Sequence, residues 1–171
     1  VVCTPVQTIA ALVEQVRPAL RPDALVTDVG STKSLICRQC EAALEGVPAK
    51  FIGSHPMAGS ERTGLENASP DLFERAACLV TPLPGADDHT IARLLGFWKA
   101  AGMLVHTLSP EKHDEIVAHV SHLPHLLASA LCSYLAGCDP DWRNFAGPGL
   151  RDHTRIAAGD PGLWQQIFGE N

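Results

Sequence analysis

The first 108 residues alternate between short apolar runs and segments whose apolar residues recur at helical spacing. The runs are rich in β-branched side chains and predict strands at residues 1–4, 24–29, 51–53, 77–81 and 103–108. Helices are predicted after Thr4, which would cap the first with Pro5 as its opening residue, after Ser31, and over 89–101. Strands that alternate with single helices indicate parallel βαβ units, so this part is predicted to be α/β.

The pattern changes after residue 108, where no further strand is predicted. Ser109, Pro110 and an acidic first turn mark the start of a long helix, which Pro124 is expected to kink. Two shorter helical pieces follow, and Asp160 is expected to cap the second of them. The chain is therefore predicted to hold part of a parallel-sheet domain over residues 1–108 and an all-helical domain over residues 109–171.

Composition places the chain among globular proteins and narrows its partners. Of its 171 residues, 46% are hydrophobic and 19% are charged, which excludes a disordered acidic tail. The net charge of -6 argues against nucleic acid or an anionic membrane surface as a partner. No apolar run approaches the roughly 20 residues of a membrane span, and no signal-like segment opens the chain. We therefore expect a cytoplasmic protein.

Both ends of the sequence are abrupt. Val1 opens the chain without an initiator Met, inside a predicted strand, and Asn171 closes it without a tail. We expect the sequence to be a fragment of a longer protein at both ends.

The six cysteines are scattered, unlike those of a disulfide-rich secreted domain. They are interpreted as reduced thiols that mostly pack as small hydrophobic residues. Cys37 and Cys40 lie well inside a predicted helix, away from the N-terminal end that would lower a thiol pKa. No second cysteine pair completes a zinc site with them.

The carboxyl ends of strands are where an α/β sheet binds ligands. His55 follows the predicted strand at 51–53 and precedes Pro56 and a Gly-rich stretch, so we expect a loop of fixed shape to present it. An imidazole with an ordinary pKa near 6.5 suits a general base at neutral pH. The alternative, a loop histidine that only bonds its neighbours, has equal weight on spacing alone.

Ser31 follows the strand at 24–29 and the turn at Gly30, and it is expected at the N-terminus of the next helix. Backbone N–H groups and the helix dipole favour a polar or anionic ligand at such a position. The alternative is an ordinary helix cap, which the local pattern favours.

His119, His122 and His125 recur at a spacing of three in the long predicted helix. This spacing sets the outer two about 120° apart around the helix, so a shared metal ion is not expected. The histidines either bond backbone groups near Pro124 or project from the kink into a cleft between the domains.

Arg151 and Arg155 lie four residues apart after the Gly-Pro-Gly sequence at 147–149. Two guanidinium groups at this spacing can hold a carboxylate. The alternative is a surface ion pair with Asp152, which is common and weak. The glycines are not a dinucleotide-binding fingerprint, because no strand precedes them and the third glycine is absent.

Four segments, taken in order, carry a resemblance to a known family. They are VTDVGSTK (26–33), FIGSHPMAGSERTG (51–64), SPEKHDEIVAHVSHLPH (109–125) and GPGLRDHTRIAAGDPGLW (147–164). The chain resembles the prephenate dehydrogenase family, which includes the arogenate and cyclohexadienyl dehydrogenases of tyrosine biosynthesis. The resemblance runs from Thr4 to Asn171, and GSHPMAGSE combined with SHLPH and TRIA is specific to it.

The resemblance implies the C-terminal part of a Rossmann-type domain, followed by a helical domain that forms a homodimer. It also implies that the Gly-rich pyrophosphate loop and the last helices of the family are missing here. The implied reaction is oxidation of prephenate or arogenate with NAD or NADP. A hydride leaves the ring carbon that bears the hydroxyl, the hydroxyl loses a proton, and the ring carboxylate departs as CO2.

The resemblance also implies roles for individual residues. His55 matches the catalytic base, and Ser31 matches the serine that bonds the substrate hydroxyl beside the nicotinamide. The segment along the cofactor corresponds to Thr4, Pro5 and Gly30, with Ser31. Substrate-binding positions correspond to His125 and Arg155, with less certain roles around the pocket for Ser60, Glu61, His122, Arg151, Asp152 and Trp164. Pro148 departs from the family, in which glycine is common at this position.

Three other functions stay open on the sequence. Another decarboxylating hydroxyacid dehydrogenase would use a catalytic lysine, and the histidine-centred segment argues against it. A non-catalytic dimerising remnant of such an enzyme would lack turnover. A zinc protein would use Cys37, Cys40 and the histidine cluster. The preference for prephenate or arogenate, and for NAD or NADP, is not fixed by this sequence.

Overall fold

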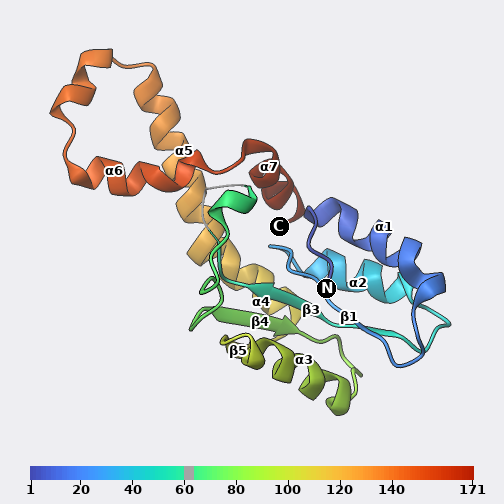
Figure 1. The fold of residues 1–171 in the computed structure, drawn as a ribbon. Helices are drawn as coiled ribbons and strands as arrows, with labels where there is room; N and C mark the ends of the chain where they lie inside the picture. The colour runs from blue at the N-terminus through green and yellow to red at the C-terminus, as the bar shows by residue number, and fades with distance from the viewer. Residues whose placement is uncertain (60–63) are drawn as a thin grey trace.

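The computed structural model describes residues 1–59 and 64–171, with all strands in the first part of the chain and helices alone after it (Figure 1). The strands are Leu25–Val26 (β1), Lys50–Phe51 (β2), Gly53–Pro56 (β3), Ala77–Thr81 (β4) and Leu104–Thr107 (β5). The α-helices are Val6–Val16 (α1), Ser34–Ala43 (α2), Asp88–Ala100 (α3), Pro110–Val117 (α4), Leu123–Ala136 (α5), Pro148–Thr154 (α6) and Pro161–Glu170 (α7).

The strands pair in both directions. β1 lies parallel to β2, Val2 forms a parallel bridge to Asp28, and β4 lies parallel to β5. β3, however, is antiparallel to β4, with His55 opposite Leu79. The expectation of parallel units throughout is therefore wrong at this pair. A parallel crossover needs an element packed on the sheet, usually a helix, and in the described part of residues 57–76 the only regular element is the 3-10 turn Leu65–Asn67.

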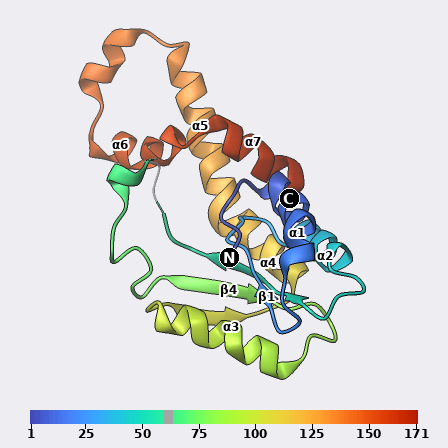
Figure 2. The same ribbon diagram turned by 45° about the vertical axis from the view of Figure 1, so that its right-hand side comes forward.

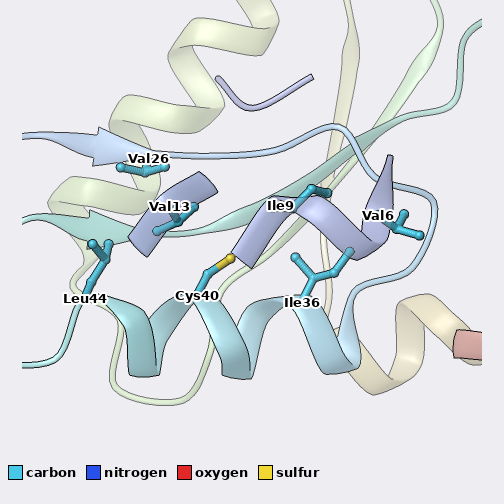
Figure 3. Close-up of a cluster of buried hydrophobic side chains, with 7 residues drawn as sticks. All are labelled: Val6, Ile9, Val13, Val26, Ile36, Cys40 and Leu44. Carbon is cyan, nitrogen blue, oxygen red and sulfur yellow. The ribbon is translucent and has the colours of Figure 1, made fainter. Parts of the chain in front are cut away.

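The strands form a two-stranded sheet of β1 and β2 and a three-stranded sheet in the order β3-β4-β5, and helices pack on them in two apolar clusters. The cluster under α1 and α2 gathers side chains from both helices and from β1, namely Val6, Ile9, Val13, Val26, Ile36, Cys40 and Leu44 (Figure 3). The cluster under α3 is Ile52, Cys78, Val80, Leu94, Trp98 and Met103. The strands are thus held between two helical layers, as expected of an α/β domain.

The interpretation of Cys37 and Cys40 as packing residues is confirmed. Both are buried, as is Cys78, while Cys3 is exposed and the remaining two are intermediate. Burial raises the pKa of Cys37 to about 11 and those of Cys40 and Cys78 to about 12. These three thiols therefore stay protonated at neutral pH and behave as small hydrophobic groups.

The predicted helix caps are right in the helical part and wrong near the N-terminus. Ser109 Oγ accepts from the Lys112 amide at 3.1 Å, and Asp160 Oδ1 accepts from the Leu163 amide at 2.7 Å, as expected. Thr4 does not cap α1, because Pro5 occupies that position. Ser31 is not at a helix end either, since α2 begins at Ser34.

The long helical stretch changes its winding just before Pro124. Residues Ala118–His122 form a π-helical turn between α4 and α5, and Pro124 is the second residue of α5. Proline cannot donate to the carbonyl one turn earlier, and a π turn is a recognised way for a helix to absorb such an interruption. The expected interruption is thus confirmed. Beyond it α6 extends away from the sheet, and α7 returns to lie beside α1 (Figure 2).

One expectation from composition needs correction. The stretch Pro110–Ala136 is long and apolar enough to cross a membrane by length and composition alone, with 22% of its most apolar window buried. Its histidines, serines and Pro124 break the apolar run, so no uninterrupted apolar stretch marks this helix in the sequence. A single such helix is weak evidence for a span, because packed helices of soluble proteins pass the same test. Its exposed apolar side chains include Val120, Leu126 and Leu127.

The close packing of β3 gives a stability test. A Cβ added at Gly53 would lie 2.6 Å from both Cys37 Sγ and Thr81 Oγ1, which are buried. We expect Gly53→Ala to lower the free energy of unfolding by about 1–3 kcal/mol. The control is Gly96→Ala in α3, where an added Cβ meets nothing within 4 Å. That variant should be neutral or slightly stabilising. Urea unfolding followed by circular dichroism compares the two, and equal stabilities would contradict this account.

Candidate functional site

A cavity of about 440 Å³ lies where the end of β3 meets the helical part of the chain. Its lining brings together residues from distant segments, among them Ser31, His55, His122, His125, Arg155 and Trp164. Each of these six was singled out on the sequence. Their meeting in one cavity supports the expectation that the site lies between the two domains.

The other expected site residues that the structure describes do not line this cavity. Gly30 precedes the lining residue Ser31 but does not itself line the cavity, nor do Thr4 and Pro5, and Arg151 and Asp152 are exposed on α6. Ser60 and Glu61 lie outside the described residues. A larger cavity of about 600 Å³ opens near the end of α2 and the turn before α3, and it contains none of the expected site residues.

His55 is held by a chain of buried side chains. It lies within β3, not in a following loop, and is 8% exposed. Its Nδ1 atom is 2.9 Å from Nε2 of His113, whose Nδ1 is 2.8 Å from Oδ1 of Asp114. Sequence reasoning missed His113 and Asp114, because they occupy two positions in the first turns of an ordinarily capped helix. His55 therefore bonds a residue far along the chain, not a sequence neighbour.

The environment of His55 keeps its imidazole neutral. Burial is the largest cause that lowers its pKa well below 6.5, and the Lys33 ammonium acts in the same direction, as does any protonation of His113 or His122. Asp114 opposes them. A neutral imidazole retains a lone pair, so His55 can accept a proton at neutral pH.

Asp114 is the carboxylate behind His55, and it also caps α2. Its Oδ1 accepts from the Lys33 amide and its Oδ2 from the Ser34 amide, both at 2.8 Å. Burial alone would raise its pKa, but hydrogen bonds from His113, Ser34 and Lys33 outweigh burial and lower the pKa to about 2. Asp114 is thus ionised at neutral pH, at the positive end of a helix.

A buried ion pair lies beneath the site. The Lys33 ammonium bonds Asp28, and both side chains are fully buried. Asp28 also accepts from the amides of Gly30 at 2.9 Å and Ser54 at 3.1 Å, while its carbonyl accepts from Ser54 Oγ at 2.6 Å. This pair fixes the end of β1 against the start of β3. The sequence placed these residues in a candidate segment but gave no sign of the pairing.

The helical side of the cavity is aromatic. The His125 ring stacks on Trp164 with centroids 3.5 Å apart and a 12° tilt, and His122 meets Trp164 edge-on at 6.0 Å. Gly159 permits this arrangement, because a Cβ there would lie 2.7 Å from the indole nitrogen of Trp164. Burial lowers the pKa of both histidines, so both are neutral at neutral pH.

The histidines differ in what they present. His122 Nδ1 lies 3.1 Å from Nδ2 of Asn171, an amide that can only donate, so the ring proton of neutral His122 is on Nε2. His119 is exposed, with its Nδ1 2.7 Å from the Glu115 carbonyl. Within residues 1–59 and 64–171, no group of three or more His, Cys, Asp or Glu side chains could hold a metal ion.

Arg155 opens the 3-10 turn Arg155–Ala158 and is the cationic residue in the lining of the cavity. The cavity therefore combines a buried neutral imidazole, a hydrogen-bond donor at His122, an aromatic wall and a cation. This set suits a small anionic ring compound that carries a hydroxyl group.

Comparison with known proteins identifies the family of this chain. The family model "Prephenate dehydrogenase, nucleotide-binding domain" matches residues 1–107, and "Prephenate dehydrogenase, dimerization domain" matches residues 109–171. The chain belongs to the prephenate dehydrogenase family. The family resemblance expected from the sequence is confirmed, and so is a Rossmann-type domain followed by a helical one.

Individual members of this family cover the whole chain. Prephenate dehydrogenase of Bacillus subtilis is 34% identical over 100% of this chain, which spans 47% of that protein. Cyclohexadienyl dehydrogenase of Zymomonas mobilis is 32% identical over 99% of this chain, which spans 58% of it. The chain thus spans about half the length of these relatives.

Solved structures agree with the assignment to the prephenate dehydrogenase family. Aquifex aeolicus prephenate dehydrogenase, in complex with hydroxyphenyl propionate and NAD+, matches with a TM-score of 0.88 and 36% identity, covering 98% of this chain and 59% of that one. Synechocystis arogenate dehydrogenase matches with a TM-score of 0.80 and 35% identity, covering 98% of this chain and 61% of that one.

The buried pair beneath the site gives a second stability test. Lys33→Met removes the ammonium and leaves the Asp28 carboxylate buried without its counter-charge, so we expect a loss of about 3–5 kcal/mol in the free energy of unfolding. Lys112→Met is the matched control, because it breaks the exposed pair with Glu115 and should change stability little. Urea unfolding measures the stability of both variants. Similar losses in the two would show that the buried Lys33–Asp28 pair does not stabilise the fold as proposed.

Proposed function

We propose that this protein catalyses the NAD(P)+-dependent oxidative decarboxylation of prephenate or arogenate in tyrosine biosynthesis. The observation that carries the proposal is the shared cavity of His55 and Arg155, a proton acceptor and a cation. Its relatives include prephenate, cyclohexadienyl and arogenate dehydrogenases. One of them was solved with hydroxyphenyl propionate, an aromatic ring that carries a hydroxyl and a carboxylate chain.

His55 is proposed as the general base. The reaction needs a group that takes the proton of the ring hydroxyl as the ring carbon loses its hydride. A neutral imidazole beside the cavity can do this, and its burial reduces competition from water. Ser31, which lines the same cavity, is proposed to bond the same hydroxyl.

Arg155 is proposed to hold a substrate carboxylate through paired N–H groups. His122, with its proton on Nε2, is a donor suited to a second polar group of the substrate. The stacked rings of His125 and Trp164 offer a flat wall for the substrate ring. The proposed roles of Ser60, Glu61, Arg151 and Asp152 stay predictions.

The proposed cofactor segment lies at the carboxyl ends of neighbouring strands. Thr4 and Pro5 follow Val2, which is bridged in parallel to Asp28, and Gly30 and Ser31 follow Asp28 itself. A Cβ at Gly30 would lie 2.9 Å from Asp28 Oδ2, so the backbone there is tightly held. Such a place fits the nicotinamide end of a dinucleotide. The chemistry that NAD(P)+ supplies when bound is acceptance of a hydride.

The protein is proposed to act as a cytoplasmic homodimer. The helical part matches a family model described as a dimerization domain. The exposed apolar side chains of α5, which include Leu123, Leu126 and Leu127, would be covered in such a dimer. The relatives named above are biosynthetic dehydrogenases, which suits the cytoplasm.

The alternative of a lysine-dependent hydroxyacid dehydrogenase is disfavoured by the position of Lys33. This lysine, the one beside His55, is fully buried, paired with Asp28 and absent from the cavity lining. A zinc protein is disfavoured because Cys37 and Cys40 are buried thiols that stay protonated. A non-catalytic remnant remains as an outcome of the activity test.

The activity test uses the full-length protein with NAD+ or NADP+ and prephenate or arogenate, following the absorbance of the reduced cofactor. We expect turnover, and we expect His55→Asn to lower kcat about 10²- to 10⁴-fold because the proton acceptor is lost. His106→Asn, at an exposed position on β5, is the control and should keep wild-type kcat. Absence of turnover in the wild type would favour the alternative of a non-catalytic remnant. A His55→Asn variant with wild-type activity would exclude His55 as the general base.

The pH dependence of kcat/KM tests the electrostatics of His55. Only its neutral form accepts a proton, so activity falls as pH drops through its pKa. Burial, with Lys33, His113 and His122, places that pKa well below 6.5 even though Asp114 opposes them. We therefore expect the acid limb of the profile below pH 6.5. A limb above pH 6.5 would contradict this description of the site.

A further inference from the structure

Two buried polar side chains have no part in the reaction as proposed so far. His113 is fully buried and Asp114 is 7% exposed, and both lie on α4, where His113 is hydrogen-bonded to His55. Neither lines the cavity, so neither can touch a substrate there. Burying two titratable side chains is costly unless they are hydrogen-bonded, so the partners of this pair matter.

The direction of the hydrogen bonds follows from the ionised state of Asp114. A carboxylate only accepts, so the proton between Asp114 and His113 is on Nδ1 of His113. A ring that carries only this proton has its lone pair on Nε2, and Nε2 of His113 lies 2.9 Å from Nδ1 of His55. That Nδ1 must donate, and the Nε2 atom of His55 is left with the lone pair.

We propose that His113 and Asp114 are positioning residues that hold His55 in the tautomer whose Nε2 atom accepts the substrate proton. The inference rests on the proposed function for its substrate, but the tautomer itself is a property of the protein. With the opposite tautomer the base would present an N–H group to the hydroxyl and could not take its proton.

The same arrangement stabilises the charge that forms when His55 takes the proton. In the imidazolium, the Nδ1–H group still donates to His113, and the negative charge of Asp114 lies one ring further away. On the sheet side Lys33 also acts on His55, and its charge is balanced by Asp28. His122 faces it from the π-helical turn and opposes the positive charge when protonated. Asp114 is thus the group that favours the product of proton transfer.

Asp114 is a poor choice for the test, because it also caps α2 and its loss would disturb folding. His113 offers a cleaner pair of variants. His113→Gln places an amide oxygen near the position of Nε2 and can still accept from His55, whereas His113→Leu fills similar space and accepts nothing. A purely structural role would make both variants similar, and a positioning role separates them.

Kinetics on the full-length protein give the first readout. We expect His113→Leu to lower kcat at least about tenfold with KM changed less than about twofold, because the substrate contacts are intact. His113→Gln should recover most of the lost kcat. Equal kcat in both variants, or a change confined to KM, would overturn the proposal.

Nitrogen NMR of the labelled imidazole rings, recorded without substrate, gives a readout that does not depend on the proposed function. In the wild type we expect His55 to be protonated at Nδ1 and unprotonated at Nε2, and His113→Leu to shift it toward the Nε2–H tautomer. A wild-type His55 that is protonated at Nε2 would overturn the proposed positioning role of His113 and Asp114, even if His113→Leu did not fold. If the wild type shows the expected tautomer but no turnover, the proposed substrate is wrong and the positioning role of His113 and Asp114 is still supported.

Discussion

The carboxylate of Asp114 is the contact on which the site depends. It caps the first amides of α2 in the sheet domain while it belongs to α4 of the helical domain. It bonds His113, and its own carbonyl accepts from the Asn171 side chain at 2.9 Å. Through its carboxylate and its backbone carbonyl, one buried residue thus joins the sheet domain, the long helix and the end of the chain. The cavity of His55 exists only where these parts are docked together.

Much of the fold could be predicted from local signals. Local sequence preferences are enough to predict the order of strands and helices. They also predict the caps at Ser109 and Asp160 and the interruption at Pro124. The antiparallel pairing of β3 could not be predicted, because strand direction is set by how the intervening segment returns to the sheet. The true start of α2 was also hidden, since its cap comes from Asp114, far along the chain.

The site was predictable where residue type alone signals chemistry. His55, Ser31 and Arg155 stood out by their place after strands or glycines, and the structure brings them to one cavity. The role of His113 could not be predicted, because its partner His55 is remote in sequence. The first turns of α4 also have the sequence pattern of an ordinary exposed helix start. Exposure of Arg151 on α6 could not be foreseen either, since spacing of four residues places two side chains on one face only while the helix continues.

The π-helical turn at Ala118–His122 determines which side of α5 faces the cavity. A residue added to an α-helix advances the following positions by about 100° around the axis. The wide turn absorbs such an advance, and it is the reason that α5 can direct His125 onto Trp164 while His119 faces solvent. If these same residues were wound as regular α-helix, every position after them would turn by about 100° around the axis, and His125 would leave Trp164 although no side chain of the aromatic wall had changed.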